Sequence, residues 1–462
     1  MVDFENPDNN DWLAVNQFSV TGENNTRRPD IVLFCNGIPV VVIELKNPTD
    51  IDADIWDAFN QLQLYKEQIP RLFYTNVVLS IDDGADARMG SLTADKERFL
   101  RWRSIDGVER DPHGVFGHGQ TLIEGLFTPE HILEMIRYFT IFQTAGGKPV
   151  KVVCAYHQFY AVKKAFARAL TASAEGGDGR GGLMWHTQGS GKSIEMACLA
   201  GMLATSTKLE NPTIVLVTDR NNLDTQLYDT FVAAKALLRQ DPELAESRSD
   251  LREKVGSRPA GGVIFTTIQK FGLEDGEDKY PVLADRRNVF VFTDEAHRSQ
   301  YGFTARLDKK TQGYKIGYAQ HLRDALPNAT FVAFTGTPVA SADRDTRQVF
   351  GDEIDELSFF AISDQRSIEK IQNEILIYPC RELLIDTDVK KRAKDLGNLF
   401  PQIQDLTSKL SEGITFEGME SLSAGVVSEF NSILDYLPAG YQIWLIDEPR
   451  IRSRAADLIK TN

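Results

Sequence analysis

The segment "WHTQGSGKSIEM", residues 185–196, decides the fold of the region around it. An apolar run ends at His186, a turn with two glycines follows, and helix-forming residues begin at Lys192. Gly189 and Gly191 allow backbone N–H groups to approach a phosphate, and a helix N-terminus adds a favourable partial positive charge. We therefore expect a strand, a phosphate-binding loop and a helix in this order, as in open α/β sheets.

The side chains of this loop predict nucleotide chemistry. Lys192 is placed to reach the β and γ phosphates of ATP, and the hydroxyl of Ser193 is placed to hold Mg²⁺. Ser190 lies between the two glycines. The pattern G-x-x-x-x-G-K-[ST] has one departure, because His186 stands at its first glycine. A flexible glycine loop without a ligand remains the alternative interpretation.

Apolar runs with little polar alternation surround the loop and are separated by helix-forming segments. They read "GLMWH", "TIVLVTD", "GVIFTTI", "NVFVFTD" and "ATFVAFTG". Such runs are typical of parallel strands that helices cover on both faces. The fold class is therefore α/β, and residues 146–345 are expected to form one doubly wound domain.

One of these runs, "NVFVFTDEAH", ends in two carboxylates. Asp294 and Glu295 lie at the carboxyl end of a buried strand, where ligands bind in such sheets. We expect Asp294 to bind Mg²⁺ and Glu295 to orient or deprotonate the attacking water, because phosphoryl transfer depends mainly on positioning and charge stabilisation. A solvated strand end is the alternative for an isolated Asp-Glu pair.

A second stretch, "RRPDIVLFCNGIPVVVIELKNP", residues 27–48, predicts a separate site. Its NG dipeptide joins two apolar strands and indicates a hairpin. Glu44 and Lys46 are two residues apart and point to the same face, where Asp30 can meet them. Two buried carboxylates repel each other unless a cation compensates them. We expect Asp30, Glu44 and a backbone carbonyl to bind Mg²⁺, with Lys46 positioning water or neutralising developing charge.

The helix-forming segment "NQLQLYKEQIP" follows this stretch. Gln61 and Tyr65 are four residues apart and therefore share one helix face. We expect both side chains to belong to the same site. The alternative for both residues is a helix face that only packs on the sheet.

The composition limits the class of protein. The chain has 462 residues, a formal net charge of -15 and four cysteines without paired spacing. We expect a soluble, cytoplasmic protein with reduced thiols, because no apolar run is long enough for a membrane span and no signal peptide begins the chain. The net charge counts against nucleic-acid binding over the whole surface, although a local basic groove is compatible with it. The segment "KERFLRWRS", residues 96–104, is a candidate DNA contact, with a solvated charged segment as the alternative.

Ordered motifs relate the central region to a known family. The phrases "GSGKS", "VLVTDR", "FTTIQKF", "DEAH" and "TGTPV" resemble, in this order, the first-lobe motifs of superfamily 2 helicases and translocases. The resemblance implies a RecA-like motor domain. It also implies that His297, Thr335 and Thr337 couple the state of ATP to movement along nucleic acid.

The phrase "YHQFYAV" resembles the adenine-reading segment of the same family. Gln158 is therefore expected to contact the base, with Tyr156 or Phe159 nearby. Packing of these aromatic side chains in the core is the alternative.

The N-terminal pattern of P-D, E-x-K and Q-x-x-x-Y resembles PD-(D/E)xK nucleases of the RecB type. Such a nuclease placed before a superfamily 2 motor resembles the restriction (R) subunit of type I restriction-modification enzymes. The resemblance implies ATP-dependent DNA translocation and endonucleolytic cleavage of double-stranded DNA, together with methyltransferase (M) and specificity (S) subunits. It implies three parts: a PD-(D/E)xK nuclease domain over residues 1–145, the motor over residues 146–345, and the start of a second motor lobe or a helical region over residues 346–462.

Two other functions remain open. The first is a type III restriction enzyme or a RecB-like repair helicase-nuclease, and the second is a catalytically silent, ATP-gated DNA clamp. We find no second-lobe motif with arginine fingers after residue 345. We therefore expect a fragment that binds ATP but hydrolyses it poorly.

Overall fold

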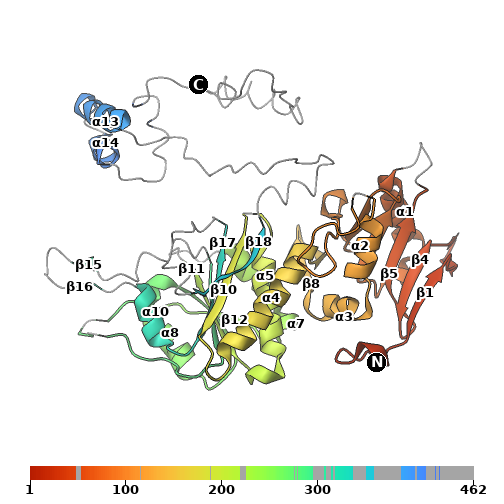
Figure 1. Ribbon diagram of the computed structural model, residues 1–462, viewed down its shortest axis with the longest axis horizontal. Coiled ribbons are helices and arrows are strands. Elements are labelled where there is room, and N and C mark those ends of the chain that lie inside the picture. Colours follow the sequence, from red (N-terminus) through yellow and green to blue (C-terminus); the bar gives the residue numbers. More distant parts are fainter. Residues whose placement is uncertain are drawn as a thin grey trace. The chain divides into compact units, whose positions relative to one another are not determined.

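The chain, in a computed structural model, forms two compact units, residues 1–369 and residues 370–462 (Figure 1). The structure describes residues 1–47, 54–114, 116–187, 189–218, 225–274, 276–277, 279–294, 306–307, 314–315, 318–336, 350–357, 387–400, 403–412, 422 and 426. Among these residues no helix is both long and apolar enough to cross a membrane.

The first unit has a five-stranded sheet near its N-terminus, with the strand order β1-β4-β5-β6-β7. Strands β4 and β5 are antiparallel, whereas β5 and β6 are parallel. The turn between β4 and β5 uses Asn36 and Gly37, both at positive φ (51° and 75°), so the predicted hairpin is confirmed. The strands are β1 (Trp12–Asn16), β4 (Ile31–Cys35), β5 (Ile38–Leu45), β6 (Val78–Asp82) and β7 (Ala87–Gly90), with a separate hairpin of β2 (Val20–Thr21) and β3 (Thr26–Arg27).

Helix α1 (Ile55–Gln68) packs against this sheet (Figure 1). Asp54 begins the helix by a capping box with Asp57, in which each side chain accepts a backbone N–H of the other. Leu62 of α1 and Val42 of β5 belong to the same buried cluster. This packing holds α1 beside the strand that carries the predicted E-x-K residues.

Short elements connect this sheet to the central one. Thr128 accepts a hydrogen bond from the backbone N–H of His131 (3.3 Å), and Pro129, which has no N–H to leave unpaired, is the first residue of α3. The elements are α2 (His118–Gly125), α3 (Pro129–Tyr138), and the hairpin of β8 (Thr140–Ala145) and β9 (Lys148–Val153).

The central sheet has seven strands in the order β12-β13-β11-β14-β17-β10-β18. All neighbouring pairs are parallel, which confirms the parallel sheet expected from the apolar runs. The two edge strands β12 and β18 were not among those runs, and β18 lies beyond residue 345. The strands are β10 (Arg180–His186), β11 (Thr213–Thr218), β12 (Pro242–Leu244), β13 (Val263–Thr267), β14 (Val289–Thr293), β17 (Thr330–Thr335) and β18 (Glu353–Leu357).

Helices cover both faces of the central sheet. Leu216 and Phe292 enter one buried cluster together with α4 and α5, whereas their strand neighbours Val215 and Val291 enter a second cluster with α8 and α10. Alternate side chains are therefore buried on opposite faces, as a doubly covered parallel sheet requires. The helices are α4 (Tyr156–Ser173), α5 (Lys192–Thr205), α6 (Thr225–Ala233), α7 (Lys235–Leu238), α8 (Arg248–Gly256) and α10 (Tyr318–Ala325), and a small hairpin joins β15 (Arg306–Leu307) to β16 (Tyr314–Lys315).

The described part of the second unit is a pair of helices, α13 (Thr387–Leu399) and α14 (Gln404–Ser411). Val389, Ala393 and Leu410 are buried together in a small apolar cluster of their own. Most of the predicted C-terminal region, residues 346–462, lies outside the described residues.

Candidate functional site

The predicted N-terminal carboxylates lie at the ends of two paired strands. Asp30 directly precedes β4, and Glu44 lies near the end of its antiparallel neighbour β5. The Asp30 carboxylate accepts a hydrogen bond from the Leu45 backbone N–H (2.9 Å) and another from Gln17 Nε2 (2.7 Å). The strand end therefore fixes the position of this carboxylate.

Glu44 is the buried member of the pair, with only 1% of its surface exposed. Burial, together with the nearby Asp30, raises the pKa of Glu44 to about 8. Tyr65 OH donates to Glu44 Oε1 (3.5 Å), but Glu44 Oε2 has no hydrogen-bond partner among the described residues. A buried, unpartnered carboxylate oxygen beside a second carboxylate fits a hard divalent cation, which would supply the missing compensation.

Lys46 completes this cluster through a chain of side-chain hydrogen bonds. Lys46 Nζ donates to Gln61 Oε1 (2.5 Å), and Gln61 Nε2 donates to Tyr65 OH (2.6 Å), which in turn reaches Glu44. The structure therefore brings together Asp30, Glu44, Lys46, Gln61 and Tyr65. The amide of Gln61 orients the lysine ammonium beside the carboxylates, where it can contact an anionic group bound to the same cation.

The phosphate loop joins β10 to α5. Gly189 and Gly191 have positive φ (84° and 90°), and Gly191 is the N-cap of α5. A Cβ at Gly191 would lie 2.3 Å from Gln158 Nε2, so both the backbone conformation and the available space require glycine there. Lys192 is the first residue of α5, and its Nζ donates to the backbone carbonyl of His186 (3.1 Å). The lysine is thus held at the strand end next to the loop.

The two serines of the loop are placed differently. Ser190 is 7% exposed, and its Oγ has no hydrogen-bond partner among the described residues. Ser193 follows Lys192 in the first turn of α5 and is partly exposed. Its hydroxyl therefore lies on the helix turn that opens toward the loop.

Two of the remaining predicted motor residues, Asp294 and Thr335, belong to the same edge of the sheet. Strands β14, β17 and β10 are parallel neighbours, so their carboxyl ends lie together. Asp294 directly follows β14, and Thr335 is the buried last residue of β17. The predicted residues Glu295, His297 and Thr337 lie outside the described residues.

Gln158, the predicted adenine contact, holds the loop backbone. Its Oε1 accepts from the Ala155 N–H (3.0 Å), and its Nε2 donates to the Ser190 carbonyl (2.9 Å). Phe159 is fully buried against Trp102, with 5.4 Å between ring centroids, and is therefore a core residue.

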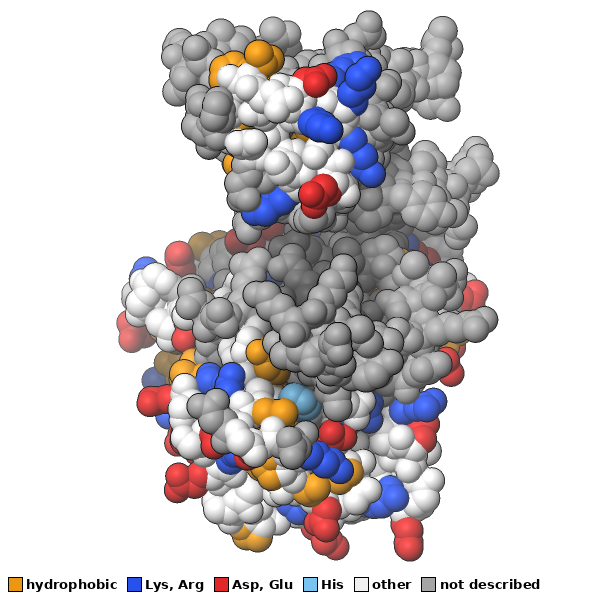
Figure 2. All heavy atoms as spheres, turned by 90° about the vertical axis from the view of Figure 1, so that its left-hand side faces the viewer, with side chains coloured by type: hydrophobic (Ala, Val, Ile, Leu, Met, Phe, Trp, Pro, Cys, Tyr) orange, Lys and Arg blue, Asp and Glu red, His pale blue; other side chains and the backbone are white. Residues whose placement is uncertain are grey.

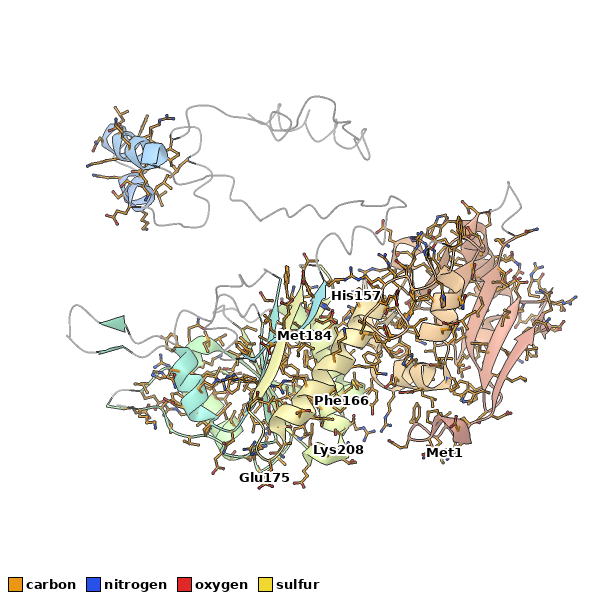
Figure 3. All side chains as sticks on the ribbon, viewed as in Figure 1. Met1, His157, Phe166, Glu175, Met184 and Lys208 are labelled. Carbon is orange, nitrogen blue, oxygen red and sulfur yellow. The ribbon has the colours of Figure 1, made fainter. Side chains whose placement is uncertain are left out.

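A cavity of about 260 Å³ lies beside the start of α4. Tyr156, His157 and Tyr160 of α4 line it together with Asp355 of β18. Figure 3 shows His157 at one end of α4, with Phe166 farther along the same helix. Of the two aromatic residues expected near the base, Tyr156 therefore borders an open space and Phe159 does not.

His186 is the residue whose importance the sequence did not reveal beyond its departure from the motif. It is fully buried, with Nδ1 2.8 Å from Glu195 Oε1 and Nε2 3.1 Å from Asp355 Oδ1. Carboxylates accept hydrogen bonds, so both ring nitrogens donate and the ring is an imidazolium. Burial alone would lower the pKa of His186, but Glu195 and the hydrogen bond with Asp355 raise it to about 9.

Lys164 extends this group, because its Nζ lies 2.6 Å from the second carboxylate oxygen of Asp355. Burial alone would raise the pKa of Asp355, but the hydrogen bonds from His186 and Lys164 hold it below its ordinary value. The four residues, called the ion chain below, are Lys164, Asp355, His186 and Glu195. One sequence signal pointed to it besides the histidine: Glu195 is a lone charge in the apolar helix segment "SIEMACLAGML".

The DNA contact that the sequence suggested at residues 96–104 does not hold for the two aromatic residues of the segment or for two of its arginines. Phe99 and Trp102 are 0% and 1% exposed, so they cannot stack on bases. Arg101 forms an ion pair with an aspartate of the same domain, and so does Arg103. That prediction is wrong for these four side chains, because the aromatic rings are needed in the core and the arginines compensate nearby acids.

Acidic and basic side chains are mixed on the surface drawn in Figure 2. In the lower body of that view the red and blue side chains interleave with orange ones. The described residues on this face therefore do not form the uniformly basic patch that would mark a nucleic-acid surface.

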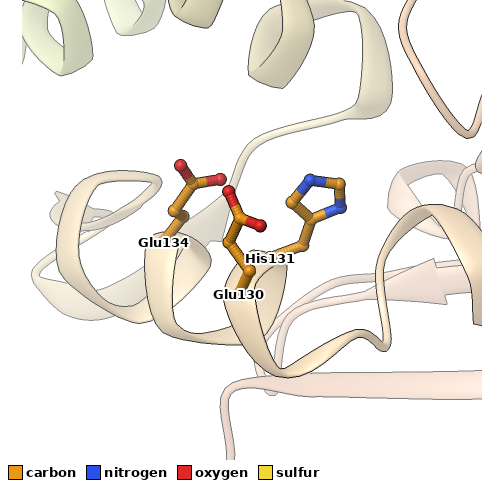
Figure 4. Close-up of side chains that lie close together, drawn as sticks. All are labelled: Glu130, His131 and Glu134. Atoms are coloured by element: carbon orange, nitrogen blue, oxygen red, sulfur yellow. The ribbon is translucent and has the colours of Figure 1, made fainter. Parts of the chain in front are cut away.

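A cluster of Glu130, His131 and Glu134 on α3 has the composition of a cation site (Figure 4). Lys163 Nζ lies 2.6 Å from the Glu134 carboxylate and 3.9 Å from that of Glu130. His131 Nδ1 lies 2.7 Å from the Gly125 carbonyl. An ammonium group thus already compensates the two carboxylates, and this cluster is an ion-paired part of α3.

Two family models match the chain. The SWI2/SNF2 ATPase model matches residues 157–404, and the model described as the type I restriction enzyme R protein N terminus matches residues 1–98. The first match covers the phosphate loop, and the second covers the carboxylate cluster. The predicted domain bounds at residues 145 and 345 do not coincide with the ends of these matches and stay predictions.

Curated relatives carry names of the same kind. The chain is 49% identical over 354 residues to the type I restriction enzyme HindI endonuclease subunit of Haemophilus influenzae, which covers 76% of this chain and 33% of the relative. It is 39% identical over 375 residues to the putative type I restriction enzyme MjaIXP endonuclease subunit of Methanocaldococcus jannaschii, covering 77% of this chain and 34% of the relative. The chain therefore spans about one third of the length of these relatives, and the predicted resemblance to R subunits is confirmed.

Among solved structures, a fragment of a putative HsdR subunit of a type I restriction enzyme from Vibrio vulnificus YJ016 is similar to this chain. The match covers 89% of this chain and 71% of that fragment, with a TM-score of 0.31 and 16% sequence identity. That likeness carries no structural argument.

Proposed function

Since the chain belongs to the SWI2/SNF2 ATPase family, we propose that it contributes the ATP-driven motor and the endonuclease of a type I restriction enzyme R subunit. The observation that carries the proposal is that one chain joins a phosphate loop at α5 to a buried carboxylate cluster at β4 and β5. The loop suits phosphoryl chemistry on ATP, and the cluster suits metal-assisted hydrolysis of a phosphodiester. Both activities together describe a nuclease whose cutting depends on a motor.

In the proposed motor, ATP draws Lys192 from the carbonyl of His186 to its β and γ phosphates. A charge-assisted bond to phosphate is stronger than a bond to a neutral carbonyl, so this exchange is favourable. Ser193 and Asp294 hold the divalent cation of the nucleotide, which we propose to be Mg²⁺, and Glu295 orients the attacking water.

The proposed base site lies next to the loop. Gln158 contacts the adenine, and the cavity bordered by Tyr156 provides the space for its ring. His297, Thr335 and Thr337 then transmit the state of ATP to movement along double-stranded DNA. This last role rests on the family motif alone.

In the proposed PD-(D/E)xK nuclease, Asp30 and Glu44 hold a second divalent cation through oxygen atoms. Oxygen ligands favour a hard cation such as Mg²⁺. The bound cation lowers the pKa of a water molecule and stabilises charge on the phosphate. Lys46, oriented by Gln61, neutralises charge that develops on the phosphodiester, and Tyr65 holds the Glu44 carboxylate in place.

Recognition of the DNA site is proposed to belong to partner subunits. The net charge is -15, and the described surface in Figure 2 mixes both signs of charge. A methyltransferase (M) subunit and a specificity (S) subunit would supply the sequence reading, while this chain acts on flanking double-stranded DNA. The complex would draw in DNA at the expense of ATP and cut it at a distance.

The test assembles the full-length protein that contains this chain with M and S partners on unmethylated plasmid DNA, ATP and Mg²⁺. We expect Glu44→Ala to abolish cleavage while ATP hydrolysis continues, because only the carboxylate cluster is changed. Lys192→Ala should abolish both activities. Glu67→Ala, an exposed position on the same helix as Gln61, should leave both unchanged.

Three results would contradict the proposal. If an assembled complex binds DNA but never cuts it, the proposed nuclease activity is contradicted. Cleavage that persists in Glu44→Ala places the chemistry elsewhere. Normal ATP-dependent DNA binding in an assembled complex without any hydrolysis or cutting would favour a silent clamp.

A further inference from the structure

The ion chain connects four separate elements of the motor domain. Lys164 comes from α4, His186 from β10, Glu195 from α5 and Asp355 from β18. Its three contacts are 2.6, 3.1 and 2.8 Å long, and His186 stands in the middle with both ring nitrogens engaged. Within the ion chain, the His186 imidazole therefore links Glu195 of α5 to Asp355 of β18.

Burying charged residues such as His186 and Glu195 is energetically unfavourable compared with burying apolar ones. His186 and Glu195 are both 0% exposed, and each buried ion costs about several kcal/mol in lost hydration unless its partner is well placed. Apolar residues of similar size pack without this cost. Paired buried charges differ from apolar contacts in that they require one arrangement of their partners, which suits a residue that must hold elements in register.

The backbone of the same histidine contacts the phosphate loop. Lys192 Nζ donates to the His186 carbonyl at 3.1 Å. Glu195 lies in the first turn of α5, whose N-terminus closes the loop. A phosphate that attracts Lys192 and the helix N-terminus would therefore disturb two of the bonds that meet at His186.

Strand β18 is the element at the other end of these contacts. Among the described strands it pairs with β10 alone, and the Thr187 N–H donates to the carbonyl of its last residue, Leu357 (3.0 Å). The pairing with β10 shifts register between Leu183 and Met184, so the backbone ladder between the two strands is irregular at that point. In the sequence, β18 precedes the second unit, residues 370–462.

We propose that His186 is a positioning residue that transmits occupancy of the phosphate loop to β18. The inference rests on the proposed binding of ATP at Lys192. Its imidazole holds Asp355, and its carbonyl releases Lys192 when phosphate binds. On this proposal, the histidine that replaces the first glycine of the G-x-x-x-x-G-K-[ST] pattern has a role of its own, which is to couple the loop to β18.

The test measures amide hydrogen exchange of residues 353–357 in the 462-residue chain, with and without ATP and Mg²⁺, beside a direct measurement of nucleotide affinity. In the wild-type chain we expect ATP to change the exchange rates of these amides several-fold. Each variant is measured at ATP concentrations that saturate it, and in Asp355→Asn and in His186→Gln we expect saturation to cause no change at β18. Lys163→Met is the matched control, because this neighbour of Lys164 on α4 binds Glu134 instead, and it should respond like wild type.

The possible failures are distinguishable. If the wild-type chain binds no ATP, the proposed function fails and this inference fails with it. If it binds ATP but β18 exchange is unchanged, or if Asp355→Asn responds like wild type, the inference alone is overturned. If His186→Gln does not fold, Asp355→Asn decides the question, since its side chain keeps the shape of aspartate.

Discussion

The two sites of this chain treat buried charge in opposite ways. In the N-terminal cluster, Glu44 is buried beside Asp30, and one of its oxygens has no partner among the described residues. In the motor domain, His186 is buried between Glu195 and a second carboxylate, and both of its ring nitrogens are engaged. In the first site the two carboxylates have one cation nearby, the Lys46 ammonium, whereas in the second site the two carboxylates have two, His186 and Lys164.

This difference teaches how to distinguish a binding site from an internal connection. A buried carboxylate that lacks compensation is stable only as the neutral acid or with an added cation, and the raised pKa of Glu44 reflects that shortage. The His186 imidazolium, by contrast, has a carboxylate at each ring nitrogen, so it requires no counter-ion from outside the chain. We therefore infer a ligand at Glu44 and a mechanical role at His186.

The largest expected effect separates the two sites by chemistry. Glu44→Gln should lower DNA cleavage by the assembled enzyme by roughly 10³-fold or more, because a neutral amide cannot replace a carboxylate ligand of the cation. Binding of a divalent cation to the 462-residue chain, measured by calorimetry, should weaken in parallel. Glu67→Gln on the exposed face of α1 serves as the control, and equal losses in both variants would contradict a specific role for Glu44.

The next effect concerns the compensated site. His186→Leu should lower the stability of the chain by roughly 3–5 kcal/mol, since it leaves the buried Glu195 carboxylate without its partner and removes one of the two cations at Asp355. Thermal unfolding measures this loss. Adding Glu195→Gln to His186→Leu should restore part of the stability, and a double variant that is no more stable than the single one would show that charge compensation is not the cause.

A smaller effect is the dependence of stability on pH. The folded pKa of Glu44 is about 8, above its unfolded value of about 4.3, so the folded chain holds a proton between these values that the unfolded chain releases. The contribution of Glu44 to stability is therefore present below pH 4 and is lost as pH rises toward 8, by an amount on the order of 1–3 kcal/mol.

Unfolding midpoints at a series of pH values measure this contribution as the difference between the wild type and Glu44→Gln. The contribution of His186 to the stability of the fold is also lost as pH rises through its folded pKa of about 9. This loss occurs in both proteins, so it cancels in the difference. A divalent cation should remove most of the difference between them. Parallel pH profiles would contradict the buried, uncompensated state of Glu44.

The smallest expected effect tests the hydrogen-bonded support of Lys46. Gln61→Ala should lower cleavage by roughly tenfold, about 1.4 kcal/mol, because the ammonium loses its orientation while the carboxylates remain. Cation affinity should stay unchanged. A variant that loses cation binding instead would mean that Gln61 acts on the carboxylates and not on the lysine.

The local elements of both sites were predictable from the sequence. The Asn36-Gly37 turn, the positive φ at Gly189 and Gly191, and the parallel strands all depend on residue type or on the pattern within a few residues. The cluster around Glu44 was predictable for the same reason, because strand alternation and helix spacing decide which side chains share a face.

The interpretation of residues 96–104 failed because it depended on burial. Arginines interleaved with aromatic residues suit a nucleic-acid surface and also suit a loop folded onto a core. Trp102 packs against Phe159, which is 57 positions away in the chain, and no local pattern shows that contact. Only the packing of α4 against this loop decided between the two readings.

By itself, the sequence determined the five inner strands of the central sheet, the turn at Asn36 and Gly37, the glycine loop and the residues that face one another across the hairpin, because these follow from backbone geometry over short distances. Only the tertiary structure decided that His186 contacts Asp355, 169 residues away, and that the Sγ atoms of Cys154 and Cys198 lie 3.6 Å apart. Such contacts depend on which strands become neighbours in the sheet and which helices cover them. The charge balance of a buried group is a sum over those neighbours, so it is known only once the chain has folded.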